Sequence, residues 1–144
     1  MKSVTFCGHS EVHDIDSIRR QLTDTVQKCI DDGAVQFYLG GYGGFDKLAA
    51  SVVRSFKKSY PHIVSTLVLA YPDRKIDELD MMLYDDTVYP PLENVIRRYA
   101  ISFRNRWMIE ASDVVVAYVT HDFGGAYTTR KYAVKNNKPI IDIK

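Results

Sequence analysis

Residues 35–50 read VQFYLGGYGGFDKLAA, and this stretch decides the fold because it passes from a strand pattern through a glycine turn into a helix pattern. Val35, Phe37 and Leu39 alternate as apolar strand residues do. Four of the chain's eight glycines then follow within five positions: Gly40, Gly41, Gly43 and Gly44. From Phe45 onwards, apolar residues recur every three or four positions, which predicts one face of an amphipathic helix. The stretch therefore predicts one strand, turn and helix unit of an α/β protein.

The glycine turn has two interpretations that the sequence leaves open. Glycine lets the backbone adopt positive φ and approach a ligand closely, and the first turn of a helix presents unpaired N–H groups. These properties favour an anion site, with phosphate as the typical occupant. The other interpretation is a tight turn without a ligand. The dinucleotide fingerprint fails because Asp46 stands at its third glycine, and no Gly-Lys-Ser/Thr sequence follows to make a nucleoside-triphosphatase loop.

Similar patterns along the rest of the chain predict alternating strands and helices. We expect further strands at Ser3–Cys7, Ile63–Tyr71, Thr87–Tyr89, Val114–Val119 and Ile140–Ile143. We expect further helices at residues 15–30, a short one within 76–83, Leu92–Arg98, Arg104–Ala111 and Ala126–Asn136. Strands that alternate with helices form right-handed crossovers and a parallel sheet. The sequence therefore predicts a three-layer, Rossmann-like α/β domain with a mostly parallel sheet over residues 1–144.

Composition and charge narrow the possible functions. The chain of 144 residues has 46% hydrophobic residues, a net charge of +1 and no apolar run of membrane-spanning length. We therefore expect a cytoplasmic protein that binds no membrane, and nucleic acid is an unfavoured partner. Cys7 and Cys29 form no CxxC pair and the four histidines lack zinc-type spacing, so no metal and no cofactor is expected.

Three turns are expected to meet at one edge of the sheet, because ligands of such folds bind at the carboxyl ends of the strands. The turns are Gly8–Ser10, Gly40–Asp46 and Thr120–Thr128. Their convergence favours a ligand site. The candidate ligand-binding residues are Gly8, His9, Ser10, Gly40, Gly41, Gly43, Gly44, Asp46, Arg104, Asn105, Gly124, Gly125 and Thr128.

Each candidate side chain also has an ordinary structural explanation. Ser10 can donate to a phosphate oxygen or simply begin a turn, and His9 can contact a ligand or be structural. Asp46 can accept ribose hydroxyls, or it can be a first-turn acid favoured by the helix dipole. Arg104 can fork onto a phosphate or carboxylate, or form a surface salt bridge. No catalytic triad, carboxylate pair or nucleophile elbow can be assembled, so the catalytic residues are unknown.

The order of these motifs resembles the SLOG superfamily, the Rossmann-like group related to the DNA-processing protein DprA and the LOG phosphoribohydrolases. The resemblance covers nearly the whole chain, and it is closest to small, stand-alone bacterial and phage members of unassigned function. It rests on Gly8-His9-Ser10, on Gly40-Gly41-x-Gly43-Gly44-x-Asp46, on Arg104-Asn105, on Ser112-Asp113 and on Gly124-Gly125. It implies a nucleotide or nucleotide derivative held at the glycine turns, and a homo-oligomer.

One departure from the family pattern bears on whether the protein only binds its ligand or also hydrolyses it. LOG enzymes carry PGGxGTxxE with an active-site glutamate, and the corresponding position here is Lys131. Lysine cannot replace a carboxylate that stabilises an oxocarbenium-like centre or activates water. A nucleotide-binding module is therefore favoured over a hydrolase of N-glycosidic bonds, for which Asp46 or Glu110 would have to serve. A DNA-associated or purely structural oligomer is the third possibility.

Overall fold

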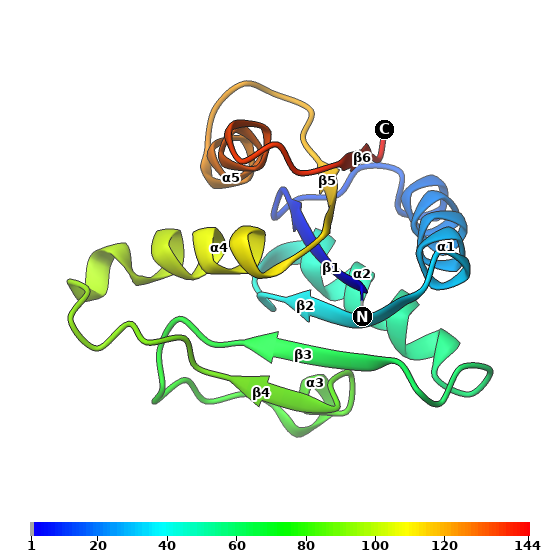
Figure 1. Cartoon of the computed structure of the whole chain (residues 1–144), viewed down its shortest axis with the longest axis horizontal. Coiled ribbons are helices and arrows are strands. Elements are labelled where there is room, and N and C mark those ends of the chain that lie inside the picture. Colours follow the sequence, from blue (N-terminus) through cyan, green and yellow to red (C-terminus); the bar gives the residue numbers. More distant parts are fainter. Residues whose placement is uncertain (1) are drawn as a thin grey trace.

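A six-stranded sheet runs through the centre of the molecule in the order β4-β3-β2-β1-β5-β6 (Figure 1). The computed structural model describes residues 2–144. The strands are β1 Lys2–Gly8, β2 Ala34–Leu39, β3 Val64–Val68, β4 Asp86–Val88, β5 Val114–Tyr118 and β6 Ile140–Asp142. All five strand pairings are parallel, which confirms the predicted α/β, Rossmann-like fold.

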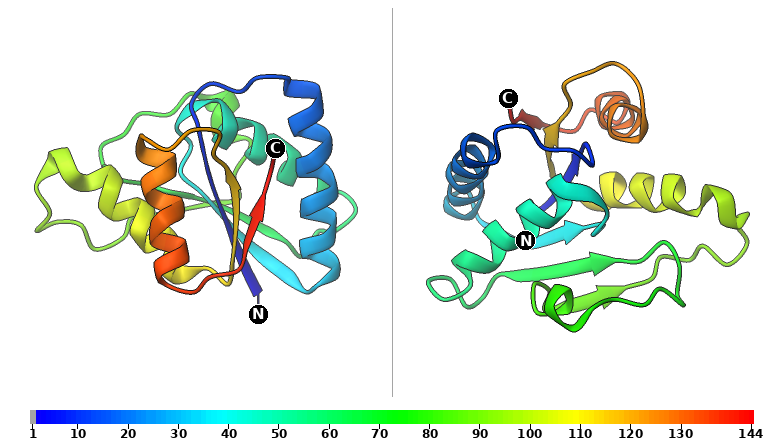
Figure 2. Two further views of the ribbon diagram at one scale, coloured as in Figure 1. Left: turned by 90° about the horizontal axis from the view of Figure 1, so that it is seen from above. Right: turned by 180° about the vertical axis from the view of Figure 1, so that it is seen from behind.

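Two pairs of helices cover the two faces of the sheet (Figure 2). The helices are α1 Ile15–Asp31, α2 Gly43–Phe56, α3 Glu78–Met81, α4 Ala100–Ala111 and α5 Gly125–Lys135. Helix α1 packs against α2 on one face, and α4 packs against α5 on the other. The short α3 lies beside the edge strand β4 (Figure 1). None of the helices in residues 2–144 has the length and apolar character needed to cross a membrane.

The hydrophobic core differs in size between the two faces. Alternate residues of β1 point to opposite sides, so Val4 and Phe6 join the large cluster under α1 and α2. Cys7 joins a small cluster with Ile109 of α4 and Ala133 of α5. Small side chains thus fill the contact between the sheet and α4–α5, and the cavity described below lies at the strand ends beside this smaller core.

The segment before α4 differs from the prediction. The expected helix Leu92–Arg98 is absent, and only a single 3₁₀ turn forms at Arg97–Tyr99. Leu92 is buried, but Ile96 is 61% exposed and Tyr99 is 47% exposed, so these two apolar side chains find no surface to pack on. Short helices are marginal without such packing, which explains the error. Helix α4 starts at Ala100, so Arg104 lies inside it and not at its beginning as expected.

The glycine turn after β2 is held by the loop that follows β1. The Gly44 N–H donates to the Ser10 carbonyl at 2.7 Å, and the Phe45 N–H donates to the His9 carbonyl at 3.4 Å. A Cβ on Gly44 would lie 2.6 Å from the Ser10 carbonyl oxygen, and one on Gly8 would lie 2.3 Å from the Phe45 ring. Glycine is therefore required here because the chain approaches itself closely.

This close approach yields a prediction on stability. Gly44→Ala places a methyl group against backbone that cannot rotate away, and we expect it to lower the free energy of unfolding by about 1–3 kcal/mol. Gly125→Ala is the matched control, since it also lies in a first helical turn but has nothing within 4 Å of an added Cβ. The control should stay within about 1 kcal/mol of wild type in urea unfolding. Equal effects of the two substitutions would contradict the packing argument.

Candidate functional site

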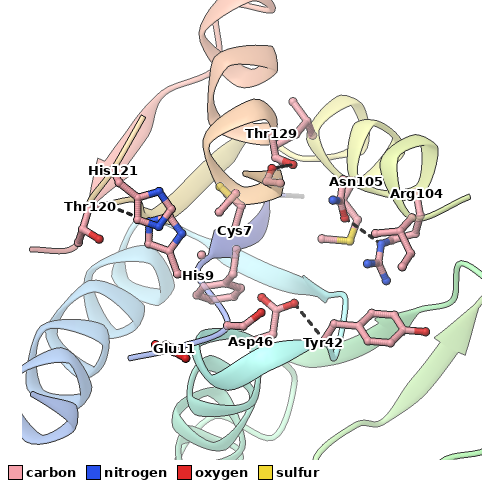
Figure 3. A pocket seen from close by; sticks show the side chains of 18 of the residues that line it. Cys7, His9, Glu11, Tyr42, Asp46, Arg104, Asn105, Thr120, His121 and Thr129 are labelled. Atoms are coloured by element: carbon pink, nitrogen blue, oxygen red, sulfur yellow. Dashed lines mark hydrogen bonds between the residues drawn. The ribbon is translucent and has the colours of Figure 1, made fainter. Parts of the chain in front are cut away.

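A cavity of about 520 Å³ opens at the carboxyl ends of β1 and β5, between α2, α4 and α5 (Figure 3). Its volume is in the range of small-molecule sites. Seven of the thirteen candidate residues line it: Gly8, His9, Ser10, Asp46, Arg104, Asn105 and Gly125. Six do not line it: Gly40, Gly41, Gly43, Gly44, Gly124 and Thr128. The structure thus brings the three predicted turns together but gives them different parts in the site.

The glycines of the turn after β2 do not line the cavity, but they leave room for neighbouring side chains, including one that does. A Cβ on Gly40 would lie 3.0 Å from the Arg104 guanidinium, and one on Gly41 would lie 2.7 Å from Leu67 Cδ1. The N–H groups of Gly44 and Phe45 already donate to carbonyls of the β1–α1 loop. The sequence suggested phosphate as the partner of these amide groups, and the structure gives them the chain's own carbonyl oxygens instead.

Arg104 is a buried guanidinium without a carboxylate partner. It is 2% exposed and lies one turn inside α4. Its Nη1 donates to the Gly40 carbonyl at 3.0 Å and to the Val68 carbonyl at 2.9 Å, and its Nε donates to Asn105 Oδ1 at 3.0 Å. Its hydrogen bonds within residues 2–144 involve Nε and Nη1 and leave Nη2 without one, and the side chain borders the cavity (Figure 3). The alternative of a surface salt bridge is therefore wrong.

Asp46 faces the same cavity from the first turn of α2 (Figure 3). Its Oδ2 accepts from the Tyr42 N–H at 3.4 Å, and the residue is 9% exposed. Burial raises the pKa of its carboxyl group from 3.8 to about 7, although the nearby charges of Arg104 and Arg74 lower it. Near neutral pH the carboxyl group is only partly ionised, so it does not fully offset the charge of Arg104.

The beginning of α5 supplies backbone donors to the cavity. Gly125 and Ala126 line it, and N–H groups in the first turn of a helix have no intrahelical partner. The Thr128 hydroxyl donates to the Gly124 carbonyl at 3.0 Å and lies outside the cavity. Thr129 borders the cavity in its place, with its hydroxyl donating to the Gly125 carbonyl at 2.8 Å.

His9 is held in one orientation and one tautomer. Its Nε2 accepts from the Thr120 N–H at 2.8 Å, so in the neutral ring the proton lies on Nδ1. The ring stacks on His121 at 3.8 Å between centroids (Figure 3). His121 in turn stacks on Phe123 at 3.9 Å. Burial, and then the proximity of His121, lower the pKa of His9. At neutral pH His9 is therefore an uncharged donor at the edge of the cavity.

Several lining residues were missed by sequence reasoning. Ile101 and Met108 lie three and four positions from Arg104, so helical periodicity could have placed them on its face. Tyr42 packs with its ring 4.0 Å from the Arg74 guanidinium and 5.3 Å from that of Arg104, and no local pattern indicates this.

Residues 2–144 hold no cluster of three His, Cys, Asp or Glu placed to bind a metal ion.

Three solved structures show the same fold. A structural genomics target named TM1055 is 19% identical with a TM-score of 0.66, covering 97% of this chain and 72% of its own. DNA processing protein A from Helicobacter pylori is 18% identical with a TM-score of 0.64, covering 98% and 64%. The molybdenum cofactor carrier protein from Chlamydomonas reinhardtii is 14% identical with a TM-score of 0.65, covering 99% and 76%. No family model and no curated protein matches the sequence.

These similarities, all below 20% identity, show the Rossmann-like fold that the resemblance implied. The chain spans about two thirds of the Helicobacter pylori protein, which is described as a single-stranded DNA-binding protein. The prediction that nucleic acid is unfavoured as a partner finds no support in these comparisons. The net charge of +1 on which it rested describes the whole chain and not its separate surfaces.

The buried carboxyl group predicts how stability depends on pH. Above pH 3.8 unfolded Asp46 releases its proton, whereas the folded protein retains it up to about pH 7. Asp46 should therefore cost the native state stability as pH rises from about 4 to about 7, by at most about 4 kcal/mol. Asp46→Asn should remove this loss in urea titrations, while exposed Asp24→Asn should keep it. Parallel pH profiles of wild type and Asp46→Asn would contradict the assignment.

Proposed function

We propose that the cavity binds the phosphate group of a nucleotide or nucleotide derivative. The observation that carries this proposal is the Arg104 guanidinium, which is buried, borders the cavity and has no carboxylate within salt-bridge distance. A buried charge without a partner is costly, and an anionic ligand offsets that cost. Because the carboxyl group of Asp46 is only partly ionised at neutral pH, it does not fully neutralise the positive charge of Arg104.

Three kinds of donor surround the space for the anion. Arg104 offers Nη2, the first turn of α5 offers the N–H groups of Gly125 and Ala126, and neutral His9 offers Nδ1–H. The rest of the cavity suits a nucleoside, because the Tyr42 ring and apolar groups line it beside the polar Asp46 and Asn105. Mixed apolar and polar linings of this kind hold an organic ligand in one orientation.

The similar structures support a phosphorylated ligand without naming it. One is described as a carrier of the molybdenum cofactor and another as a binder of single-stranded DNA, whose backbone carries phosphate groups. Hydrolysis of an N-glycosidic bond is the weaker alternative. Of the two carboxylates suggested for it, Asp46 lines the cavity, but Glu110 is exposed on α4 and lies outside it.

We further propose that the protein acts in the cytoplasm.

Substitution of Arg104 tests the proposed function. Titration calorimetry with inorganic phosphate and with nucleoside monophosphates should show at least tenfold weaker binding to Arg104→Lys, since lysine lacks the second donor arm. Arg74→Lys is the matched control, because Arg74 also donates to the Gly40 and Gly41 carbonyls but does not line the cavity. Unchanged affinity in a folded Arg104→Lys protein would contradict the proposal.

A second measurement avoids the risk that Arg104→Lys is unstable. Phosphate titrated into ¹⁵N-labelled wild-type protein should shift the side-chain N–H signals of Arg104 and the amide signals of Gly125 and Ala126. Saturable shifts that spare all three groups would place the anion elsewhere. A ligand at a hundred times its Kd should also stabilise the fold by about 2.7 kcal/mol, which makes a thermal-shift screen of nucleotides informative.

We also propose that the protein forms a homo-oligomer. Ile96 and Tyr99 are exposed in the segment before α4, which projects from the molecule (Figure 1), and Phe103 in the first turn of α4 is 42% exposed. Contiguous apolar residues on a projecting segment are typical of protein interfaces. Light scattering at micromolar concentration should give at least a dimer mass, and Ile96→Asp with Tyr99→Asp should reduce it to a monomer. Exposed Val134→Asp is the control, and a monomeric wild type would contradict the proposal.

A further inference from the structure

A second hollow of about 240 Å³ lies between α4 and α5, and we call it the α4–α5 groove. Its cations are Arg106 of α4 and Lys131 and Lys135 of α5. The hydroxyl-bearing residues Ser102 and Thr128 line it as well. No acidic side chain borders it, and the three cations share its lining with these hydroxyl-bearing residues and with the ring of Tyr132.

The cations of the groove have no anionic partner within residues 2–144. Arg106 makes neither a hydrogen bond nor a salt bridge there, and its guanidinium lies 5.4 Å from the rings of Phe103 and Tyr132. Lys131 makes no salt bridge within residues 2–144, and its Nζ lies 5.5 Å from the centre of the Tyr127 ring.

A neighbouring cation on α5 behaves differently. Arg130 forms a two-pronged pair with Asp142, at 2.9 Å from Nε and 2.8 Å from Nη2. The fold therefore pairs one cation of this helix and leaves the next one free. Lys135 lies in the last turn, where the helix dipole already favours a cation, so the argument rests on Arg106 and Lys131.

The groove adjoins the cavity proposed to hold the nucleotide. Thr129 lines both, and Thr128 stands beside it on the groove side. An anion at the N–H groups of Gly125 and Ala126 lies at the start of the same helix. A phosphate chain that leaves the cavity across the first turn of α5 therefore meets the groove directly.

We propose that the α4–α5 groove binds a second phosphate group or a short phosphate chain of the ligand whose first phosphate occupies the cavity. This inference rests on the proposed function and narrows it to nucleotides that carry more than one phosphate group. It gives Lys131 a role, since the position where LOG enzymes carry a glutamate here presents a cation to an anionic ligand. Arg106 and Lys131 then act as determinants of specificity for the number of phosphate groups.

Calorimetric titration with inorganic phosphate and inorganic tripolyphosphate tests the inference at constant ionic strength, because exposed charge contacts are screened by salt. Wild type should bind tripolyphosphate at least tenfold more tightly than phosphate. The double variant Arg106→Gln, Lys131→Gln should lose at least tenfold in affinity for tripolyphosphate and less than twofold for phosphate. The control Arg20→Gln, Lys58→Gln removes the same charge at exposed positions outside the groove and should bind both as wild type does.

Other results would overturn the inference in recognisable ways. Unchanged tripolyphosphate affinity in the double variant would exclude the groove as a phosphate-binding site. An equal loss of affinity in the control would mean that the loss reflects the overall charge of the protein and not the groove. If an oligothymidylate strand loses affinity in the double variant while tripolyphosphate does not, the groove is a nucleic-acid surface and the inference fails. Absence of saturable phosphate binding to wild type would instead count against the cavity, which separates failure of the proposed function from failure of the groove.

Discussion

The hydrogen bonds from Arg104 Nη1 to the Gly40 and Val68 carbonyls are the interaction on which the site depends. Gly40 follows the last residue of β2 and Val68 is the last residue of β3, and their carbonyls need a donor when they are buried. The guanidinium provides it and ties α4 to the sheet edge. The same bonds fix the direction of Nη2, so the structural role of this side chain and the ligand-binding role that we propose for it depend on the same geometry.

The glycine turn after β2 makes the position of this arginine possible. Gly40 leaves the room that the guanidinium occupies, and Gly44 lets α2 start against the Ser10 carbonyl. Asp46 is thereby carried into the cavity, where burial keeps its carboxyl group partly protonated. A fully ionised carboxylate would neutralise Arg104 and repel an anion, so the burial of Asp46 and the free charge of Arg104 favour the same kind of ligand.

The fold was predictable from the sequence because its strands are strongly apolar and its helices have clear periodicity. The β5 pattern VVVAY and the α2 stripe require buried faces, and tertiary packing agrees with both. The site was predictable only in part. Proximity of the strand ends placed Gly8, Asp46 and Gly125 together, but the His9 contact to Thr120 joins residues 111 positions apart and has no local signal. The segment before α4 failed because exposed apolar residues give the same pattern as buried ones.

Net charge was the least informative property of the sequence, and the structure shows why. The net charge of +1 counts every cation alike. It does not distinguish Arg130, which is paired with Asp142, from Arg106 and Lys131, which have no anionic partner within residues 2–144. Electrostatic attraction acts over about 10 Å at moderate salt, so a ligand responds to the charges near its binding site and not to the total. Arg104, the start of α5 and the α4–α5 groove adjoin one another on one side of the sheet. The free cations of this almost neutral chain thus lie on the side of the sheet where we propose that a phosphorylated ligand binds.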